Sequence, residues 1–186
     1  GANLPKNLVD LDNSVEKNIS LISEAKNTTP DKITVCILDR PRHNEIISSL
    51  KKMQVNLKLI TDGDVSGIIY IVDQKSPVDM YMGIGGGPEG VLAAAALSCY
   101  GGQIQTRLVL TEDETVRAKK MGVTDLKKKY NIEDMIKGDV MFCATGITDG
   151  DLVKGIKDHK DMFEASTLAL HKNGKINTVI TNKHNK

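Results

Sequence analysis

The chain has 186 residues, is 40% hydrophobic and 26% charged, and carries a net charge of +1, which together indicate one globular domain spanning residues 1–186. This balance excludes a general attraction for nucleic acid or anionic membranes, and the 3% aromatic content, without any Trp, argues against a base-stacking surface. Since the sequence has neither a run of about 18 apolar residues nor a signal peptide, we expect a cytoplasmic protein without a membrane span.

The first part of the chain alternates between helical and strand patterns. A capping-box pattern, Asn13-x-x-Glu16, predicts a helix that ends before residues 27–31. The continuous apolar run at 32–38 predicts a strand that is covered on both faces. The elements expected next are a helix at 44–53, a strand at 55–60, a short helix at 65–72, a strand at 79–84 and a helix at 88–100.

The second part continues the alternation and ends in a hairpin. Thr111-x-x-Glu114 is another capping-box pattern, which predicts a charged helix to Met121 with Gly122 as its stop. Asn173-Gly174 lies between two alternating stretches and predicts a type I′ turn. The other predicted elements are a strand at 103–110, a helical piece at 125–131, a strand at 139–144 and a helix starting within 149–156.

The repeated strand–helix alternation predicts an α/β fold, layered, with a largely parallel sheet flanked by helices and a C-terminal antiparallel hairpin. Cys36, Cys99 and Cys143 lie far apart in apolar surroundings, and the four histidines lack the H-E-x-x-H spacing. The cysteines are therefore expected to be free thiols in a reducing compartment rather than parts of a disulfide or zinc site.

Polar loops follow four of the predicted strands. They are "DRPRH" (39–43), "TDGD" (61–64), "GGGPEG" (85–90) and "TGITDGD" (145–151). Because parallel strands end on the same side of a sheet and ligands bind outside those ends, we expect the four loops to meet at one edge.

The loops bring together residue types suited to a phosphorylated sugar and a cation. Arginines and the backbone N–H groups of glycines 85–87, at a helix start, suit phosphate, while carboxylates suit a hard divalent cation or sugar hydroxyls. The candidates are Arg40, Arg42, His43, Asp62, Asp64, Glu89, Asp149 and Asp151. Taken singly, each has a structural alternative: Glu89 can complement a helix dipole, the aspartates can form turns or caps, and His43 can cap the next helix.

The glycine loop also matches the dinucleotide pattern G-x-G-x-x-G at Gly85, Gly87 and Gly90. An acid at Glu112 or Asp113 has the spacing expected for a ribose contact. However, Glu89 would repel a pyrophosphate at the same helix N-terminus, and the loop follows a later strand than the fingerprint does. A metal ion beside a phosphate explains Glu89 better.

Four motifs together resemble a known family. "DRPRH", "DGDV", "GIGGGPEGVLAAAAL" and "ATGITDGDLVKGI" are similar, in order and spacing, to the C-terminal part of class II fructose-1,6-bisphosphatases, from about Ile33 to Ile156. The resemblance implies the fold of the inositol-phosphatase and sugar-phosphatase superfamily. It also implies hydrolysis of the 1-phosphate of fructose 1,6-bisphosphate with Mn²⁺ or Mg²⁺.

The resemblance carries roles over to particular residues. Glu89 would be a metal ligand, the arginine motif would line the phosphate and sugar, and the Asp-Gly-Asp motif would contact hydroxyls. The residues implied to bind the substrate are Arg40, Pro41, Arg42, Asp62, Gly63, Asp64 and Gly86. The family's other metal-binding carboxylates, and its threonine that helps activate water, belong to an N-terminal half that these 186 residues do not match.

The expected partners follow from that resemblance. They are a small sugar bisphosphate, the N-terminal half of the same enzyme and further copies of the chain in a homo-oligomer, with neither nucleic acid nor membrane. Two other functions stay open: a sugar-phosphate-binding module without catalysis, and, more distantly, an NAD-dependent oxidoreductase.

Overall fold

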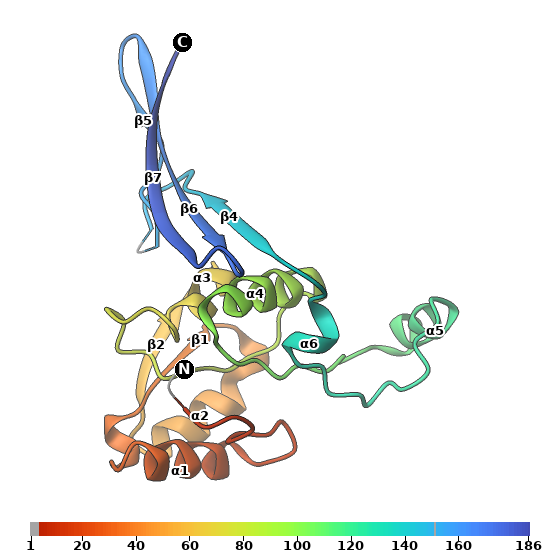
Figure 1. The fold of residues 1–186 in the computed structure, drawn as a ribbon. Coiled ribbons are helices and arrows are strands. Elements are labelled where there is room, and N and C mark those ends of the chain that lie inside the picture. The colour runs from red at the N-terminus through yellow and green to blue at the C-terminus, as the bar shows by residue number, and fades with distance from the viewer. Residues whose placement is uncertain (1–3, 151) are drawn as a thin grey trace.

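The computed structural model describes residues 4–150 and 152–186, in which helices and strands stack in alternating layers while the segment around residues 112–120 extends to one side (Figure 1). Helices α1 (Val15–Ala25) and α2 (Asn44–Lys52) form the first layer, and a parallel sheet forms the second. Helices α3 (Asp64–Ile69) and α4 (Gly87–Tyr100) lie between that sheet and an antiparallel sheet. The predicted layered α/β class is therefore confirmed, with two sheets in place of one.

The parallel sheet is built around β1 (Thr34–Leu38), which pairs with β2 (Asn56–Ile60) on one side and β3 (Met80–Tyr81) on the other. Val35 packs into a cluster with residues of α1 and α2, whereas Cys36 packs against Tyr70 on the opposite face. Each fully buried aliphatic side chain contributes roughly 1.5–3 kcal/mol, so the unbroken apolar run makes β1 the centre of the fold. The prediction of a strand covered on both faces is confirmed.

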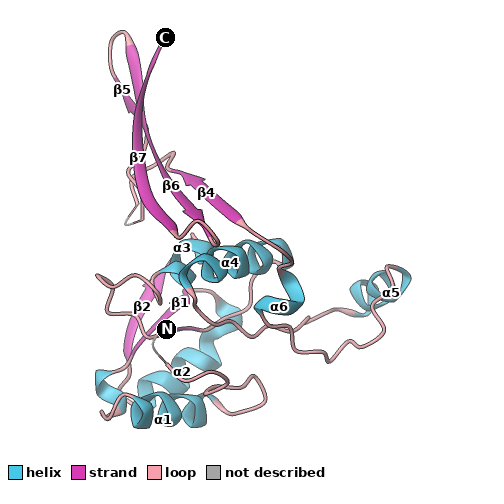
Figure 2. Cartoon of the chain, in the orientation of Figure 1, coloured by secondary structure: helices cyan, strands magenta, loops and turns pink. Residues whose placement is uncertain are grey.

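The antiparallel sheet is built around β6 (Met162–His171). One edge of β6 pairs with β4 (Met141–Thr145) and β5 (Lys157–Asp158), and the other pairs along its length with β7 (Ile176–Asn185). Phe142, Leu168 and Leu170 pack against Ile69 of α3 and the alanines of α4. Figure 2 shows the β6–β7 hairpin projecting beyond the helices toward the C-terminus.

The caps of two helices test the predicted helix starts. Helix α5 (Glu112–Lys120) carries the predicted capping box, because Thr111 accepts from the Glu114 N–H and the Glu114 side chain accepts from the Thr111 N–H. Helix α1 is instead capped by Ser14, whose hydroxyl accepts from the Lys17 N–H at 3.1 Å, so the box predicted at Asn13 is wrong. The remaining helical elements are the short η1 (Pro30–Lys32), η2 (Pro41–His43) and α6 (Ile132–Met135).

The strand predicted at 103–110 is wrong, although its residues alternate as a strand does. Thr106 makes a single antiparallel bridge to Tyr130, and residues 103–110, all of which the structure describes, form no strand. The glutamines of this stretch bind the N-terminal segment instead: Gln103 donates to Leu4 O at 2.8 Å, and Gln105 accepts from the Leu11 N–H at 2.7 Å. Alternation marks a strand only where a neighbouring strand is present to pair with it.

Two predicted helical pieces are also wrong. Residues 125–131 form a turn in which the Asp125 carboxylate accepts from the Lys127 N–H at 2.9 Å. In the stretch 149–156 the Asp149 carboxylate reaches across to the Gly155 N–H at 2.9 Å, which closes a loop. Short aspartate side chains compete with the helix for backbone N–H groups, which explains both outcomes. Asp151 lies outside the described residues.

The predicted C-terminal hairpin is confirmed, but its turn is not type I′. That turn needs positive φ at both central residues, whereas the positive φ here belongs to Lys175, at 50°. Four residues, 172–175, connect the strands, and within them the Lys175 N–H donates to Lys172 O at 3.4 Å.

The strand predicted at 139–144 is present as β4, but it lies in the antiparallel sheet rather than in the parallel one. In the described part of the chain, no helix is both long and apolar enough to cross a bilayer.

Candidate functional site

Three of the four polar loops leave the same edge of the parallel sheet. The Asp39 N–H donates to Ile60 O at 2.8 Å and the Met82 N–H to Cys36 O at 3.1 Å, so the ends of β1, β2 and β3 lie side by side. The fourth loop, 145–151, follows β4 in the other sheet, so it does not leave this edge of the parallel sheet as the predicted strand order implied. The candidate site therefore consists of residues 39–43, 61–64 and 83–89.

The arginine motif ties the loops to one another. The Arg40 guanidinium donates to the carbonyls of Asp39, at 3.1 Å, and of Thr61 in the neighbouring loop. Pro41 opens the short helix η2 with its fixed φ, and Arg42, one residue later, donates from Nε to Ile84 O at 2.9 Å. Arg42 is exposed and stands between the end of β1 and the glycine loop, where an anion would meet it.

The Asp-Gly-Asp motif turns the chain from β2 into α3. Gly63 has φ 72°, a left-handed conformation that favours glycine, and Asp64 is the first residue of the helix. Gly67 lets α3 approach the sheet closely, since a Cβ at that position would lie 2.8 Å from Ile60 Cδ1. Asp62 is exposed, and Asp64 is half-buried.

Asp64 also lies against the glycine loop. A Cβ built on Gly85 would be 2.9 Å from Asp64 Oδ2, so the carboxylate rests over the Gly85 backbone. Burial raises the pKa of Tyr81 to about 12, and the Asp64 charge adds to that rise while Arg42 opposes it. Asp64 and Arg42 are thus both close enough to act electrostatically on the Tyr81 hydroxyl.

Glu89 lies in the first turn of α4, where the sequence predicts a helix start with Pro88 in its first turn. Gly86 is the N-cap residue, and a Cβ on Gly86 would lie only 2.1 Å from Glu89 Oε2. The glutamate therefore folds back over the helix N-terminus. A carboxylate in that place is stabilised by the helix dipole, and it occupies the space in which a dinucleotide pyrophosphate would lie, which argues against an NAD site.

His43 is the residue that the sequence interpretation undervalued. The side chain is fully buried, Nδ1 lies 2.8 Å from Leu38 O, and Nε2 accepts from the Ile84 N–H at 2.8 Å. His43 is the N-cap residue of α2, as the structural alternative suggested, but its ring makes no cap hydrogen bond because both nitrogens are engaged elsewhere. A signal was present in the sequence: His43 belongs to the polar loop 39–43, which follows the strand predicted at 32–38 and also carries Arg40 and Arg42.

The carboxylates of the described residues fall short of a complete metal site. In residues 4–150 and 152–186, no group of three or more His, Cys, Asp or Glu side chains is placed to hold a metal ion. A hard divalent cation takes about six oxygen ligands, so Glu89 can supply one ligand of a shared centre but not the whole of it. The residues fit part of a cation site.

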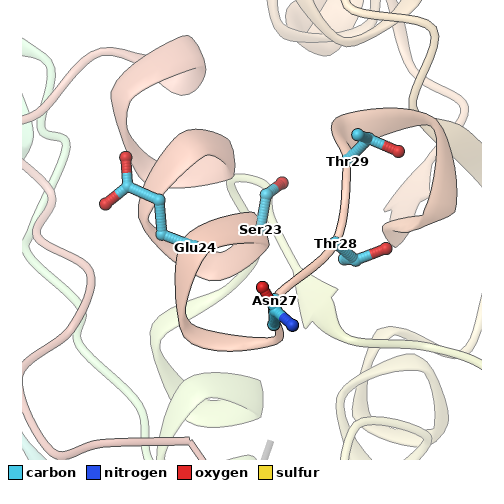
Figure 3. Close-up of a pocket in the computed structure, with 5 residues that line it drawn as sticks. All are labelled: Ser23, Glu24, Asn27, Thr28 and Thr29. Carbon is cyan, nitrogen blue, oxygen red and sulfur yellow. The ribbon is translucent and has the colours of Figure 1, made fainter.

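A pocket of about 480 Å³ lies elsewhere, between the end of α1 and the start of η1 (Figure 3). It is lined by Ser23, Glu24, Asn27, Thr28 and Thr29. This segment precedes β1, so the pocket lies toward the amino ends of the parallel strands, opposite the candidate site. Ligands of parallel sheets bind at the carboxyl ends, so we do not assign this pocket a role.

A family model and three relatives that match this chain are described as fructose-1,6-bisphosphatases. The family model described as bacterial fructose-1,6-bisphosphatase, glpX-encoded, matches residues 1–184. A relative from Trichodesmium erythraeum (strain IMS101), named D-fructose 1,6-bisphosphatase class 2/sedoheptulose 1,7-bisphosphatase, is 33% identical over 193 aligned positions, which cover 96% of this chain and 56% of the relative.

Two further relatives carry the same name. The protein from Synechococcus sp. (strain JA-3-3Ab) is 36% identical, covering 89% of this chain and 52% of its own. The protein from Microcystis aeruginosa (strain NIES-843 / IAM M-2473) is 34% identical, covering 82% of this chain and 48% of its own. The chain thus spans about half the length of the curated relatives it matches.

Proposed function

This chain belongs to the family of bacterial fructose-1,6-bisphosphatases, and from that premise we propose that it holds the substrate for hydrolysis of the 1-phosphate of fructose 1,6-bisphosphate. The observation that carries the proposal is the meeting of Arg42, Asp64 and Glu89 around one glycine loop. The products would be fructose 6-phosphate and phosphate, which makes the reaction a phosphoric monoester hydrolysis.

Each group has a role in this proposal. Arg40 and Arg42 position the phosphate and sugar, and Asp62 and Asp64 accept hydrogen bonds from sugar hydroxyls. Pro41, Gly63 and Gly86, one from each of the three loops, fix the directions of these side chains. Glu89 supplies one carboxylate to a Mn²⁺ or Mg²⁺ centre, whose other ligands come from a polypeptide corresponding to the unmatched part of the relatives. A divalent cation would make the attacking water more acidic and would neutralise charge on the departing oxygen.

Phosphate release from fructose 1,6-bisphosphate in the presence of Mn²⁺ tests the proposal. The chain is assayed alone, and then with a polypeptide for the part of the Trichodesmium relative that it does not match. We expect turnover only in the mixture, and Glu89→Gln should lower it by at least about 10–100-fold, since loss of even an indirect metal contact has that effect. Glu112→Gln, on the exposed helix α5, is the matched control and should leave turnover unchanged.

Two results would contradict the proposal. Turnover by the chain alone would mean that the metal centre is not shared, and undiminished turnover with Glu89→Gln would remove the metal role of Glu89. A second candidate, a sugar-phosphate-binding module without catalysis, is favoured by the incomplete carboxylate set of the described residues. Tight binding of fructose 1,6-bisphosphate with no turnover in either assay would support it.

A further inference from the structure

The backbone N–H and C=O of Ile84 are both held, by two consecutive residues. The Ile84 N–H donates to His43 Nε2 at 2.8 Å, and Ile84 O accepts from Arg42 Nε at 2.9 Å. Ile84 itself is 39% exposed and lies at the start of the glycine loop, whereas His43 is fully buried beneath it. A surface loop is thus attached to the interior at one defined point.

The hydrogen bonds fix the protonation state of the ring. Because the Ile84 N–H is a donor, His43 Nε2 must accept and carries no proton, so Nδ1 carries it and donates to Leu38 O at 2.8 Å. Leu38 is the last residue of β1. The neutral Nδ1–H form therefore links the end of the central strand to the loop, and a ring that exchanged its two roles would lose both contacts.

The backbone at Gly83 is shaped to admit this ring. Gly83 has φ 155°, in the region that favours glycine, and a Cβ built there would lie 3.2 Å from His43 Cε1. The ring thus packs against the Gly83 backbone as well as bonding to the next residue. Downstream of this anchor, Gly85 lies under the Asp64 carboxylate and Gly86 under that of Glu89.

We propose that His43 is a positioning residue, which together with Arg42 clamps Ile84 and so sets where the glycine loop presents its N–H groups and the Asp64 and Glu89 carboxylates. This inference rests on the proposed function for its effect on ligand binding, but the clamp itself does not depend on that function. Because Arg42 Nε already donates to Ile84 O, the terminal nitrogens of the guanidinium are the groups that would bind a phosphate.

Two substitutions separate the two bonds of the ring. In His43→Gln the amide oxygen reaches the position of Nε2 and can accept from the Ile84 N–H, but the contact with Leu38 O is lost. In His43→Asn the amide nitrogen takes the place of Nδ1 and can donate to Leu38 O, but the Ile84 N–H loses its partner. Both variants remove the ring, and Asn leaves the larger cavity, so a purely space-filling role predicts a lower overall stability for His43→Asn but no selective loss of protection at the Ile84 amide.

Three measurements on the chain test the clamp. In the unaltered protein, the imidazole ¹⁵N spectrum should show the Nδ1–H form, and the Ile84 amide should exchange slowly with solvent. Slow exchange should persist in His43→Gln and be lost in His43→Asn. The dissociation constant for fructose 1,6-bisphosphate should rise about tenfold or more in His43→Asn and stay near that of the unaltered protein in His43→Gln.

Each outcome decides something. An Nε2–H imidazole in the unaltered protein would overturn the clamp without the need for any variant, and so would fast exchange of the Ile84 amide. Equal amide exchange in two folded variants would also overturn it. If the unaltered chain does not bind fructose 1,6-bisphosphate, the proposed function fails in this assay, while the imidazole and amide measurements still decide whether His43 holds Ile84.

Discussion

At the scale of single residues, Gly86 and Glu89 share a space that one added methyl group would fill. The backbone of Gly86, with φ −71° and ψ 147°, is one that alanine adopts without strain, so the effect of Gly86→Ala comes from displacing the glutamate, which lies 2.1 Å from the new Cβ. We predict that the affinity for fructose 1,6-bisphosphate in the presence of Mn²⁺ falls about tenfold or more, as measured by calorimetry.

Gly90→Ala provides the control on the same helix. Among the described residues outside the helix's own backbone, no heavy atom lies within 4 Å of a Cβ built at Gly90. This variant should bind as the unaltered chain does and gain about 0.5–1 kcal/mol of stability, because alanine favours the helix over glycine. Equal affinities of the two alanine variants would show that the position of Glu89 does not matter for binding.

The cysteines differ in their exposure, and this difference predicts their reactivity. Burial raises the pKa of the Cys36 thiol to about 11, and the charge of Lys58 only partly opposes that rise, so little thiolate exists at pH 8. Cys143 is exposed on β4. We predict that a thiol-specific disulfide reagent at pH 8 modifies Cys143 rapidly in the folded chain and Cys36 only after unfolding, with peptide mapping as the measurement. Rapid labelling of Cys36 would contradict its burial.

At the scale of elements, the fit of α3 on the parallel sheet depends on Gly67. A Cβ there would lie 2.8 Å from Ile60 Cδ1, 3.1 Å from the Tyr81 ring and 3.3 Å from Cys36 Sγ, side chains from each of the three strands. We predict that Gly67→Ala lowers the free energy of unfolding by about 1–3 kcal/mol, since the core has no room for the methyl group. Urea unfolding measures this, with Gly87→Ala as the control that should not destabilise the chain.

The N-terminal segment is attached to the rest of the chain by an exposed ion cluster. Lys129 Nζ lies 2.8 Å from the carboxylates of both Asp10 and Asp12, and Arg107 reaches Asp12 at 2.6 Å. The hydrogen bonds from Lys129 hold the pKa of each aspartate below its ordinary value of 3.8. A carboxyl group whose pKa is lower in the folded chain than in the unfolded chain stabilises the fold at pH values above its unfolded pKa. That stabilisation is lost as the pH falls through the folded pKa.

The lowered pKa values of Asp10 and Asp12 give a prediction for Lys129→Met. The variant should melt at a lower temperature than the unaltered chain at pH 6, and the difference should shrink below about pH 4 as the aspartates take up protons. Salt should also reduce the difference, because the cluster is exposed. Melting curves recorded by circular dichroism at several pH values measure it, and a difference that stays constant down to pH 2 would contradict the assignment.

The elements that could be predicted from the sequence are those whose cause is local. The apolar run around Cys36 predicts β1, and the Thr111–Glu114 pair predicts the start of α5, because burial and capping both act on neighbouring residues. The stretch 103–110 could not be predicted, since the absence of a partner strand within the described residues is a property of the whole fold. The same holds for the sheet to which β4 belongs.

The candidate site divides in the same way. The convergence of Arg42, Asp64 and Glu89 could be predicted from the order of strands and loops, because parallel strands end on one side. The attachment of His43 to Ile84 could not, because the direction of a side chain is set by tertiary packing rather than by its neighbours in the sequence. The exposed turns with short aspartates, at 125 and 149, misled the interpretation since they resemble helix starts.

At the scale of the whole molecule, the layering places the candidate site at the carboxyl ends of the parallel strands, opposite the pocket of Ser23–Thr29. The α3 and α4 layer is covered by a sheet on each side, and the buried residues that hold it, Ile69, Ala95 and Ala96, lie beyond the first turns of the two helices. Residues 87–89 at the start of α4 are exposed, and Asp64 at the start of α3 is half-buried. A rigid frame with an exposed rim suits the binding of a small charged ligand.

The location of ligand binding tests the central claim most directly. Amide signals of the ¹⁵N-labelled chain are compared before and after adding fructose 1,6-bisphosphate, with fructose as the control that lacks both phosphates. The account predicts that the bisphosphate shifts signals of residues 39–43, 61–64 and 83–89, and that fructose does so far more weakly. Shifts concentrated at the pocket of Ser23–Thr29, or along β6 and β7, with these three loops unaffected, would contradict it.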